Sequence, residues 1–300
     1  MKDSLLLVGT GALATLFAVK LAAAGIDVSM LGTWKIGLEA LRKEGARLND
    51  AAGLPVRATS NPLDCQGTKY AIVLVKSWQT ERAGHQLSEC LTEDGLVISL
   101  QNGLGNDEIL AGILGEKRVG RGITTLGATL LGPGHVHLGG EGQVILEKCS
   151  QINSLEEKLR VSNFDVDIVN DIQPQVWGKL VMNAAINPLT ALLRVKNAGL
   201  LENRYVCTLM REIAEEAALV AGVIGISLPF TDPATAVEEV ARRSAENLSS
   251  MLQDILRGGQ TEIDAINGKI VQLGEKHNVP VPVNRTIWLL VNSLSERGNI

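Results

Sequence analysis

The stretch Leu5-Leu-Leu-Val-Gly-Thr-Gly-Ala-Leu-Ala14 joins a short apolar strand, a turn with two glycines and a helix-forming run over residues 15–24. In this order Gly9 makes a tight turn, Gly11 lets the backbone approach a phosphate, and Ala14 lets the helix pack close to the strand. The N–H groups and the positive dipole at the start of the helix attract an anion. The stretch therefore predicts a pyrophosphate site for a dinucleotide, formed by Gly9, Thr10, Gly11, Ala12, Leu13 and Ala14.

Two other interpretations of this stretch compete with the dinucleotide site. A secretory signal peptide would combine Lys2 and the apolar run with the small residues 22–24, but Asp3, Lys20 and the two glycines oppose it. An ordinary strand–helix turn of another α/β protein would bind no nucleotide. The dinucleotide site remains the leading interpretation.

Composition excludes several classes of protein. A chain of 300 residues has room for about two domains, and 45% hydrophobic with 20% charged residues indicates well-packed cores. No apolar run reaches the roughly 18 residues of a membrane-spanning helix. The net charge of −5, without a cluster of Lys and Arg, argues against a nucleic-acid partner. We therefore expect neither a membrane nor a nucleic acid as a partner.

Cysteines and histidines indicate neither disulfides nor a metal. The cysteines are far apart and form no Cys-x-x-Cys pair, so we expect four reduced thiols in a cytoplasmic protein. His135 and His137 would share one face of a strand. An exposed pair is the more frequent outcome there, because no third ligand is apparent. We expect no bound metal. The four cysteines are Cys65, Cys90, Cys149 and Cys207.

Strand and helix signals alternate through the first half of the chain, which is typical of a parallel sheet covered on both faces. Residues 120–146 are rich in Gly, Thr, Val and His, and Gly132-Pro-Gly134 is a turn, so this segment predicts an antiparallel extension of the sheet. Strands are expected at 27–31, 56–59, 70–75, 95–100 and 164–169, and helices at 38–44 and 80–90.

From residue 175 onward the sequence is typical of helices. Asp232-Pro233 is a helix N-cap with proline at the first helical position, and Asp171-Ile-Gln-Pro174 forms a junction. The helical runs cover 203–222, 232–246, 261–276 and 283–295. We predict an α/β fold with a Rossmann-type doubly wound sheet over residues 1–170, which binds the dinucleotide, followed by an all-α substrate and catalytic domain over residues 171–300.

The end of the second predicted strand bears on the choice of cofactor. NAD-preferring domains place an acid there for the ribose 2′-hydroxyl, whereas this chain has Thr33 and Lys35. A hydroxyl and an ammonium suit a 2′-phosphate, and Lys76 after the strand at 70–75 adds a second charge at the same edge. The alternative is that both lysines are solvated surface residues. The missing acid favours NADP(H).

Polar residues in three segments mark the expected reaction site. Asn102 follows a buried strand and therefore lies at the ligand-binding edge of the sheet. Lys179, Asn183 and Asn187 recur every fourth residue on one helix face across roughly 12 Å, among apolar neighbours. Unpartnered buried amides and ammonium groups are costly, so this stripe indicates a binding site; the alternative is a solvated helix face.

A further segment contains Gly258-Gly259 as a turn, followed by Thr261 as the expected cap of the next helix. Glu262 would then lie in the first turn of that helix, where a carboxylate interacts favourably with the helix dipole. From its position alone, Glu262 is interpreted as a structural residue.

Taken together, these segments resemble the ketopantoate reductase (2-dehydropantoate 2-reductase) family over nearly the full length. The lysine–asparagine stripe together with the two C-terminal motifs is far more specific than the glycine-rich turn. The matching motifs are Gly9-Thr-Gly-Ala-Leu-Ala14, Val75-Lys-Ser-Trp-Gln79, Gln101-Asn-Gly-Leu-Gly105, Trp177-Gly-Lys-Leu-Val-Met-Asn183, Asn187-Pro-Leu-Thr-Ala-Leu192, Ser249-Ser-Met-Leu-Gln-Asp254, Thr261-Glu-Ile-Asp264 and Asn267-Gly268.

The resemblance implies NADPH-dependent reduction of 2-dehydropantoate to pantoate, on the route to pantothenate and coenzyme A. It implies that Lys179 is the general acid, that Glu262 holds the substrate, and that Asn102 lies near both nicotinamide and substrate. The pantoate site would be lined by Asn183, Asn187 and Ser250. The arginine that the family often carries after the second strand is absent, which weakens the inferred NADP preference.

Two other functions remain open from the sequence. The stripe of Lys179, Asn183 and Asn187 indicates the reaction but does not identify the acyl group of the substrate. A reductase of another branched 2-oxo acid is therefore one alternative. A non-catalytic NADP-binding sensor is the other. The expected partner in either reductase is a small 2-oxo acid, and the sequence leaves a homodimer open.

Overall fold

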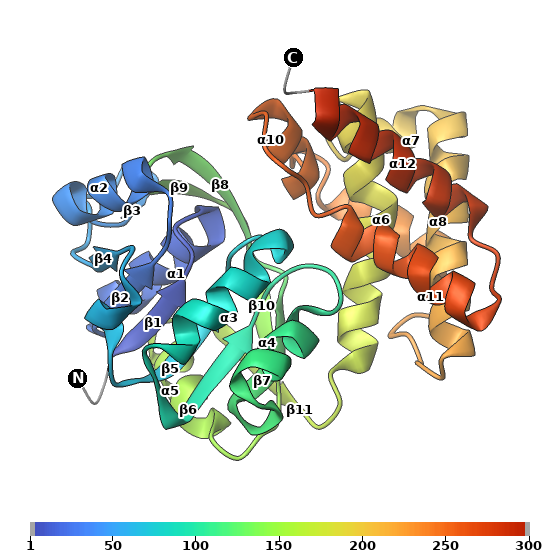
Figure 1. The fold of residues 1–300 in the computed structure, drawn as a ribbon. Coiled ribbons are helices and arrows are strands. Elements are labelled where there is room, and N and C mark those ends of the chain that lie inside the picture. Colours follow the sequence, from blue (N-terminus) through green and yellow to red (C-terminus); the bar gives the residue numbers. More distant parts are fainter. Residues whose placement is uncertain (1–3, 298–300) are drawn as a thin grey trace. The chain divides into compact units, whose positions relative to one another are not determined.

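The computed structural model describes residues 4–297, so Lys2 and Asp3 lie outside the described residues. The chain divides into two compact units. The first comprises the chain up to Gln101 together with Gly105–Ile172, and the second comprises Asn102–Leu104 and the chain from Gln173 onward. Figure 1 draws the first unit mainly in blue and green and the second in yellow to red.

An eight-stranded sheet forms the centre of the first unit, in the order β11-β10-β7-β6-β5-β1-β2-β4. β10 runs antiparallel to β7, and all other neighbours are parallel. This confirms the predicted α/β class. The strands are β1 Leu5–Val8, β2 Val28–Leu31, β4 Arg57–Thr59, β5 Thr68–Val73, β6 Leu91–Ser99, β7 Val119–Thr124, β10 Gln143–Glu147 and β11 Asp165–Val169.

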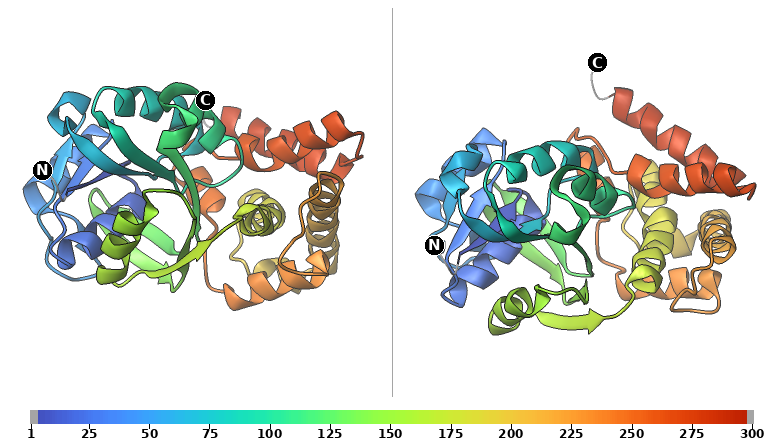
Figure 2. Two further views of the ribbon diagram at one scale, coloured as in Figure 1. Left: turned by 90° about the horizontal axis from the view of Figure 1, so that it is seen from below. Right: turned by 60° about the horizontal axis from the view of Figure 1, so that its bottom comes forward.

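Helices cover both faces of this sheet because the buried strands are apolar on both sides. In β1, Leu5 and Leu7 belong to one core cluster together with Phe17 of α1, whereas Leu6 and Val8 belong to a second cluster with residues of α3 and α4. Figure 2 shows α3 and α4 on one side of the sheet and α5 on the other. The helices are α1 Ala12–Ala23, α2 Lys35–Glu44, α3 Thr80–Ser88, α4 Asn106–Leu114 and α5 Ile152–Val161.

The expected antiparallel extension over residues 120–146 is only partly correct. β7 and β10 extend the large sheet, but β8 (Gly127–Gly132) and β9 (His135–Gly140) form a hairpin that pairs with β3 (Arg47–Leu48) in a separate three-stranded sheet. This small sheet packs on α1, a long-range contact that strand propensity does not reveal. On β9, both histidine rings hydrogen-bond Asn49 at 2.7 Å.

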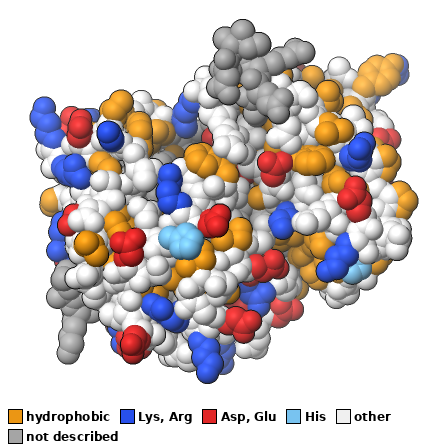
Figure 3. Space-filling view, viewed as in Figure 1, with side chains coloured by type: hydrophobic (Ala, Val, Ile, Leu, Met, Phe, Trp, Pro, Cys, Tyr) orange, Lys and Arg blue, Asp and Glu red, His pale blue; other side chains and the backbone are white. Residues whose placement is uncertain are grey.

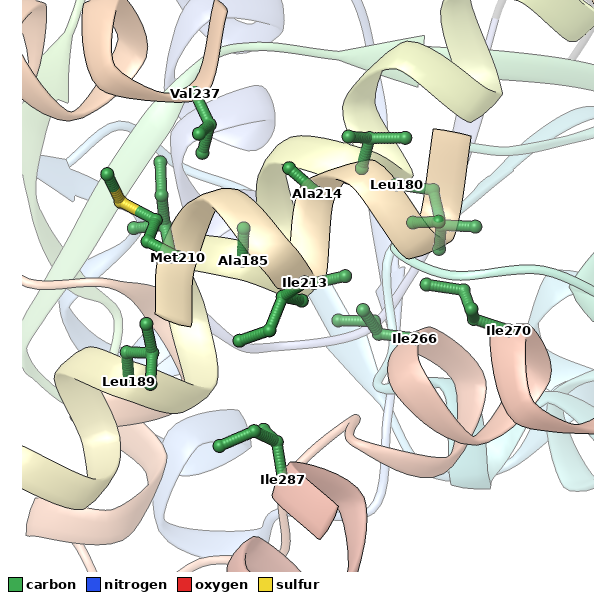
Figure 4. Close-up of a cluster of buried hydrophobic side chains, with 14 of the residues drawn as sticks. Leu180, Ala185, Leu189, Met210, Ile213, Ala214, Val237, Ile266, Ile270 and Ile287 are labelled. Atoms are coloured by element: carbon green, nitrogen blue, oxygen red, sulfur yellow. The ribbon is translucent and has the colours of Figure 1, made fainter. Parts of the chain in front are cut away.

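The second unit is helical around the long helix α6. Figure 4 shows Leu180, Ala185 and Leu189 of α6 in its core, next to Met210 and Ile213 of α8. The predicted Asp232 cap is confirmed, since its side chain accepts a hydrogen bond from the Ala234 N–H at 3.0 Å. The helices are α6 Gln173–Leu193, α7 Gly199–Glu202, α8 Arg204–Val223, α9 Pro233–Arg243, α10 Ser250–Leu256, α11 Lys269–His277 and α12 Pro282–Arg297.

The predicted helix over residues 261–276 is wrong in its first part. The helix that Thr261 was expected to cap starts later, with a π-helical turn η4 (Asp264–Gly268), and only then continues as α11. A tertiary contact stabilises the wide turn, since the Trp288 Nε1–H donates to Asp264 Oδ1 at 2.6 Å. The indole also packs closely against Gly268, where a Cβ would lie 3.0 Å from the indole nitrogen.

Among residues 4–297, no helix is long and apolar enough to cross a membrane, and no three His, Cys, Asp or Glu side chains are grouped as metal ligands require. All four cysteines are free thiols. On the face drawn in Figure 3, acidic and basic side chains are interspersed.

Candidate active site

The glycine-rich turn has the backbone that a dinucleotide site requires. Gly9 has φ +135°, and a Cβ there would lie 3.2 Å from the carbonyl group of Leu74, so only glycine fits. Gly11 is the N-cap of α1, and a Cβ there would meet nothing within 4 Å. Ala14 is fully buried, as close packing of the helix on the strand demands. The position at Gly11 is therefore open for a ligand.

The start of α1 is suited to an anion. No side chain caps this terminus, and its first turn contains no acid. Ala12 and Leu13 therefore present their N–H groups without competition from a protein carboxylate or hydroxyl. Thr10 is buried. It lies close to Gly32, since a Cβ built on Gly32 would be 2.8 Å from the threonine methyl group. This arrangement fits the pyrophosphate of a dinucleotide.

The residues expected at the 2′-phosphate lie at the same edge of the sheet. β2 and β5 are the two neighbours of β1, so the loops after all three strands share one edge. Thr33 is exposed after β2, and Lys35 is the exposed first residue of α2, whose first turn has no acid. Lys76 is half-buried after β5.

A buried polar cluster that sequence reasoning missed holds the loops after β5 and β6. The Gln101 side-chain amide donates to the Val75 carbonyl at 3.0 Å and to Thr80 Oγ1 at 2.8 Å. Thr80 Oγ1 in turn lies 2.8 Å from Asn106 Oδ1. A glutamine at the end of an otherwise apolar strand is the sequence signal for this cluster. The cluster fixes the backbone at Val75, the residue before Lys76.

The polar stripe on α6 is not a solvated helix face. Lys179 and Asn183 are half-buried, and Asn187 is only 6% exposed. Burial lowers the pKa of Lys179 from 10.5 to about 8, because desolvation penalises the ammonium. The negative charge of Glu262 acts in the opposite direction and partly offsets this effect. Lys179 is thus an amine whose proton is held less tightly than that of an ordinary lysine.

Glu262 lies close to the other expected site residues in the second unit. It is 5% exposed, and its Oε2 accepts a hydrogen bond from Asn102 Nδ2 at 3.1 Å. The segment that contains Asn102 is fixed by a hydrogen bond from the Leu104 N–H to the Ala265 carbonyl at 2.9 Å. A buried carboxylate is stable only with such partners. Glu262 is thus linked to Asn102 by a hydrogen bond and to Lys179 by an electrostatic interaction.

Ser250 is the first residue of α10, and its neighbour Ser249 anchors that helix. Ser249 Oγ accepts a hydrogen bond from the Leu252 N–H at 3.0 Å and lies 2.6 Å from Thr190 Oγ1 on α6. Thr190 also lies 2.8 Å from the Asn187 carbonyl. These contacts tie the start of α10 to the turn of α6 that carries Asn187.

Three further buried asparagines were given no role by the sequence: Asn197 and Asn284 were not singled out, and Asn267 was quoted only as part of the Asn267-Gly268 motif. Asn197 is 6% exposed and donates to Ser244 Oγ at 2.8 Å, while its Oδ1 has no partner within residues 4–297. Asn267 and Asn284 are fully buried and hydrogen-bond each other at 3.0 Å. Isolated asparagines carry no periodic signal, and Asn267-Gly268 is more typical of a turn than of a helix interior.

A glycine-rich turn after the first strand of a mostly parallel sheet suits a dinucleotide, and the comparisons with known proteins assign the chain to the dinucleotide-binding oxidoreductases. Two family models match the chain, "Ketopantoate reductase PanE/ApbA" over residues 5–151 and "Ketopantoate reductase PanE/ApbA C terminal" over residues 171–295. The chain belongs to the ketopantoate reductase family, whose members act on CH–OH groups.

Individual relatives agree with this assignment over almost the whole chain. A 2-dehydropantoate 2-reductase from Archaeoglobus fulgidus is 40% identical, with 96% of each chain covered. The solved PanE/ApbA family ketopantoate reductase from Ralstonia eutropha JMP134 has a TM-score of 0.92 and 30% identity, covering 99% of this chain and 100% of its own. A D-mandelate dehydrogenase solved with NADH and anilino(oxo)acetate has a TM-score of 0.90 and 25% identity, covering 99% of both chains.

Proposed function

We propose that this protein reduces 2-dehydropantoate to pantoate with NADPH and that Lys179 is the general acid. The observation that carries the proposal is the half-buried Lys179, with a pKa of about 8, under the influence of the buried Glu262 carboxylate. General acids are most effective when their pKa lies near the working pH. The full-length family match supports the choice of reaction.

The chemistry places a specific demand on Lys179. Bound NADPH would supply a hydride to the keto carbon of the substrate. Negative charge then develops on the carbonyl oxygen, and a nearby ammonium stabilises this charge before it transfers a proton to the oxygen. Because burial already weakens the hold of Lys179 on its proton, this transfer is easier than from an exposed lysine.

Glu262 is proposed to bind the hydroxyl end of the substrate. Its carboxylate accepts hydrogen bonds, as it does from Asn102, and it would repel the carboxylate of a 2-oxo acid. Asn183, Asn187 and Ser250 are proposed as uncharged hydrogen-bonding groups for the remaining polar atoms of the substrate. In this arrangement Glu262 and Lys179 contact different parts of one molecule.

NADPH is proposed over NADH because of the loops beside the glycine-rich turn. Thr33 and Lys35 lie where an acid would select NADH, and Lys76 follows the strand on the other side of β1. A phosphate accepts charge-assisted hydrogen bonds from lysine ammonium groups, so these residues favour a nucleotide with a 2′-phosphate.

A second candidate function is supported by one structural neighbour. The D-mandelate dehydrogenase with a TM-score of 0.90 was solved with NADH and the 2-oxo acid anilino(oxo)acetate. The same fold therefore accommodates NADH and a 2-oxo acid with an aromatic substituent. The corresponding proposal for this chain is reduction of a 2-oxo acid other than ketopantoate.

A steady-state assay with both nucleotides tests these proposals. Oxidation of NADPH and of NADH is followed with three acids: 2-dehydropantoate, 2-oxoisovalerate, which lacks the hydroxymethyl group, and phenylglyoxylate. We expect the highest kcat/KM for 2-dehydropantoate with NADPH. Preference for phenylglyoxylate with NADH would support the second candidate. Binding of NADPH without turnover of any acid would indicate the sensor instead.

A further inference from the structure

The π-helical turn η4 starts two residues after Glu262 and supports its backbone. The Gly268 N–H donates to the Ile263 carbonyl at 2.9 Å, and the Ile266 N–H donates to the Glu262 carbonyl at 3.1 Å. Turns of this kind are rare and occur frequently at functional sites. Figure 4 shows Ile266 of this turn directed into the core of the second unit. The position of Glu262 therefore depends on how η4 is held.

Asn267 holds η4 against α6. Its Nδ2 donates to the Ala184 carbonyl of α6 at 3.1 Å and to Asn284 Oδ1 at 3.0 Å. Asn284 continues the network to α8, donating to the Ile213 carbonyl at 3.1 Å and to Glu216 Oε2 at 2.8 Å. Ala184 follows Asn183 directly and lies little more than one turn after Lys179. The network thus links η4 to the helix that carries the polar stripe.

The same turn also holds the segment that contains Asn102. The Leu104 N–H donates to the Ala265 carbonyl at 2.9 Å, and a Cβ on Gly103 would lie 2.4 Å from that carbonyl oxygen. Gly103 also has φ +83°, which disfavours other residues. Only a glycine lets this segment approach η4 closely enough for Asn102 to reach Glu262.

Burial of the Asn267 side chain costs free energy, because one of its polar atoms is unpaired among residues 4–297. Its side chain is fully buried, and its Oδ1 has no hydrogen-bond partner within the described part of the chain. A buried polar network with an unsatisfied atom is less stable than an apolar core of the same shape. An apolar residue of similar size at this position would leave the Ala184 carbonyl and Asn284 Oδ1 without this donor.

We propose that Asn267 is a positioning residue for the reaction: through η4 it sets the placement of Glu262 relative to Asn102 and to the Lys179 helix. The inference rests on the proposed function, in which these three residues form the reduction site. Asn267 itself donates to a backbone carbonyl and to another asparagine, and it acts through the placement of Glu262.

The test compares Asn267→Ala with the control variant Met210→Ala. Met210 is fully buried in the same core but takes no part in this hydrogen-bond network. Both variants should lower Tm. Asn267→Ala should also lower kcat/KM about tenfold or more, mainly through kcat, with the Kd for NADPH unchanged. Met210→Ala should keep kcat/KM within about threefold of the wild type. Activity is measured well below both Tm values.

A second readout is independent of turnover. The pH dependence of Lys179 acylation, followed by peptide mass spectrometry, reports the pKa of this amine. If Glu262 moves away in Asn267→Ala, the pKa of Lys179 should fall further below its ordinary value, because a nearby negative charge is lost. Met210→Ala should leave it unchanged. If the wild-type protein reduces no 2-oxo acid, the proposed function fails and this readout alone decides the role of Asn267.

Two results would overturn the proposal. One is an Asn267→Ala variant with reduced Tm but unchanged kcat/KM and unchanged Lys179 acylation. The other is an equal loss of activity in Met210→Ala, since activity would then follow global stability. If Asn267→Ala does not fold, Asn267→Leu replaces it, because leucine keeps a similar volume but cannot donate to the Ala184 carbonyl. Normal kcat and normal Lys179 acylation in Asn267→Leu would equally reject the role of Asn267.

Discussion

Asn102 Nδ2 donates a hydrogen bond to Glu262 Oε2 at 3.1 Å, although the two residues are 160 positions apart in the chain. In the sequence Asn102 follows β6, a strand of the first unit, but its contacts assign it to the second unit. Hydrogen bonds to charged groups contribute about 1.5–3 kcal/mol when they are buried. This contact orients a carboxylate that sequence position alone assigns to a structural role.

Replacement of Lys179 by alanine should abolish most of the activity. Without the ammonium the proposed proton donor is lost, so kcat should fall about 10²- to 10⁴-fold. The Kd for NADPH, measured by fluorescence titration, should stay unchanged. Lys196→Ala is the matched control, because Lys196 lies on the surface of the same unit and pairs with Glu246 at 2.7 Å. Wild-type rates in Lys179→Ala would show that the acid is misassigned.

The rate should decrease at alkaline pH. A general acid must carry its proton, and with a pKa of about 8 Lys179 is mostly protonated below pH 8 and mostly neutral above it. We therefore expect kcat/KM to fall about tenfold per pH unit above pH 8. Glu262→Gln removes a charge that raises the pKa of Lys179, so the decline should move to lower pH. Glu246→Gln should not move it, and an unshifted profile in Glu262→Gln would contradict the proposed coupling.

The two glycines of the turn should respond differently to alanine. In Gly9→Ala the new methyl group meets the Leu74 backbone at 3.2 Å with φ at +135°, so the first unit should lose stability. In Gly11→Ala nothing lies within 4 Å and φ is −83°, so the fold should persist. The methyl group would instead occupy the space for the phosphates. Circular dichroism melting and NADPH titration distinguish the two; tight NADPH binding by Gly11→Ala would place the pyrophosphate elsewhere.

Lys35 should affect discrimination between the two nucleotides. Loss of one charge-assisted contact to a 2′-phosphate corresponds to about a 10- to 100-fold increase in KM for NADPH. KM for NADH should remain unchanged, because that nucleotide lacks the phosphate. Lys43→Ala, an exposed lysine in the last turn of the same helix, controls for net charge. Equal increases for both nucleotides in Lys35→Ala would place Lys35 outside the 2′-phosphate site.

The features that could be predicted from the sequence are those set by neighbouring residues, such as apolar runs, helix caps and the spacing of polar side chains. Apolar runs such as β5 are confirmed as central strands, and the Asp232-Pro233 cap begins a helix as expected. The stripe on α6 follows from a spacing of four residues, which helix geometry alone places on one face. The residues of the glycine-rich turn could be identified because the backbone demands their small size.

Features that depend on long-range contacts could not be predicted. The hairpin β8–β9 separates from the large sheet because it pairs with β3, and the expected helix after Thr261 starts as a π turn because Trp288 and Asn284 contact it. Hydrogen bonds between residues far apart in the sequence produce no repeating pattern of residue types, so sequence patterns do not reveal them.

The sequence by itself determined the class of the fold, the glycine-rich turn and the polar stripe on α6, because periodicity and small residues act over a few neighbours. Only the tertiary structure decided that Glu262 is buried beside Asn102 and lowers the cost of a charged Lys179. Burial and electrostatic coupling depend on which helices pack together, and packing is a property of the whole unit.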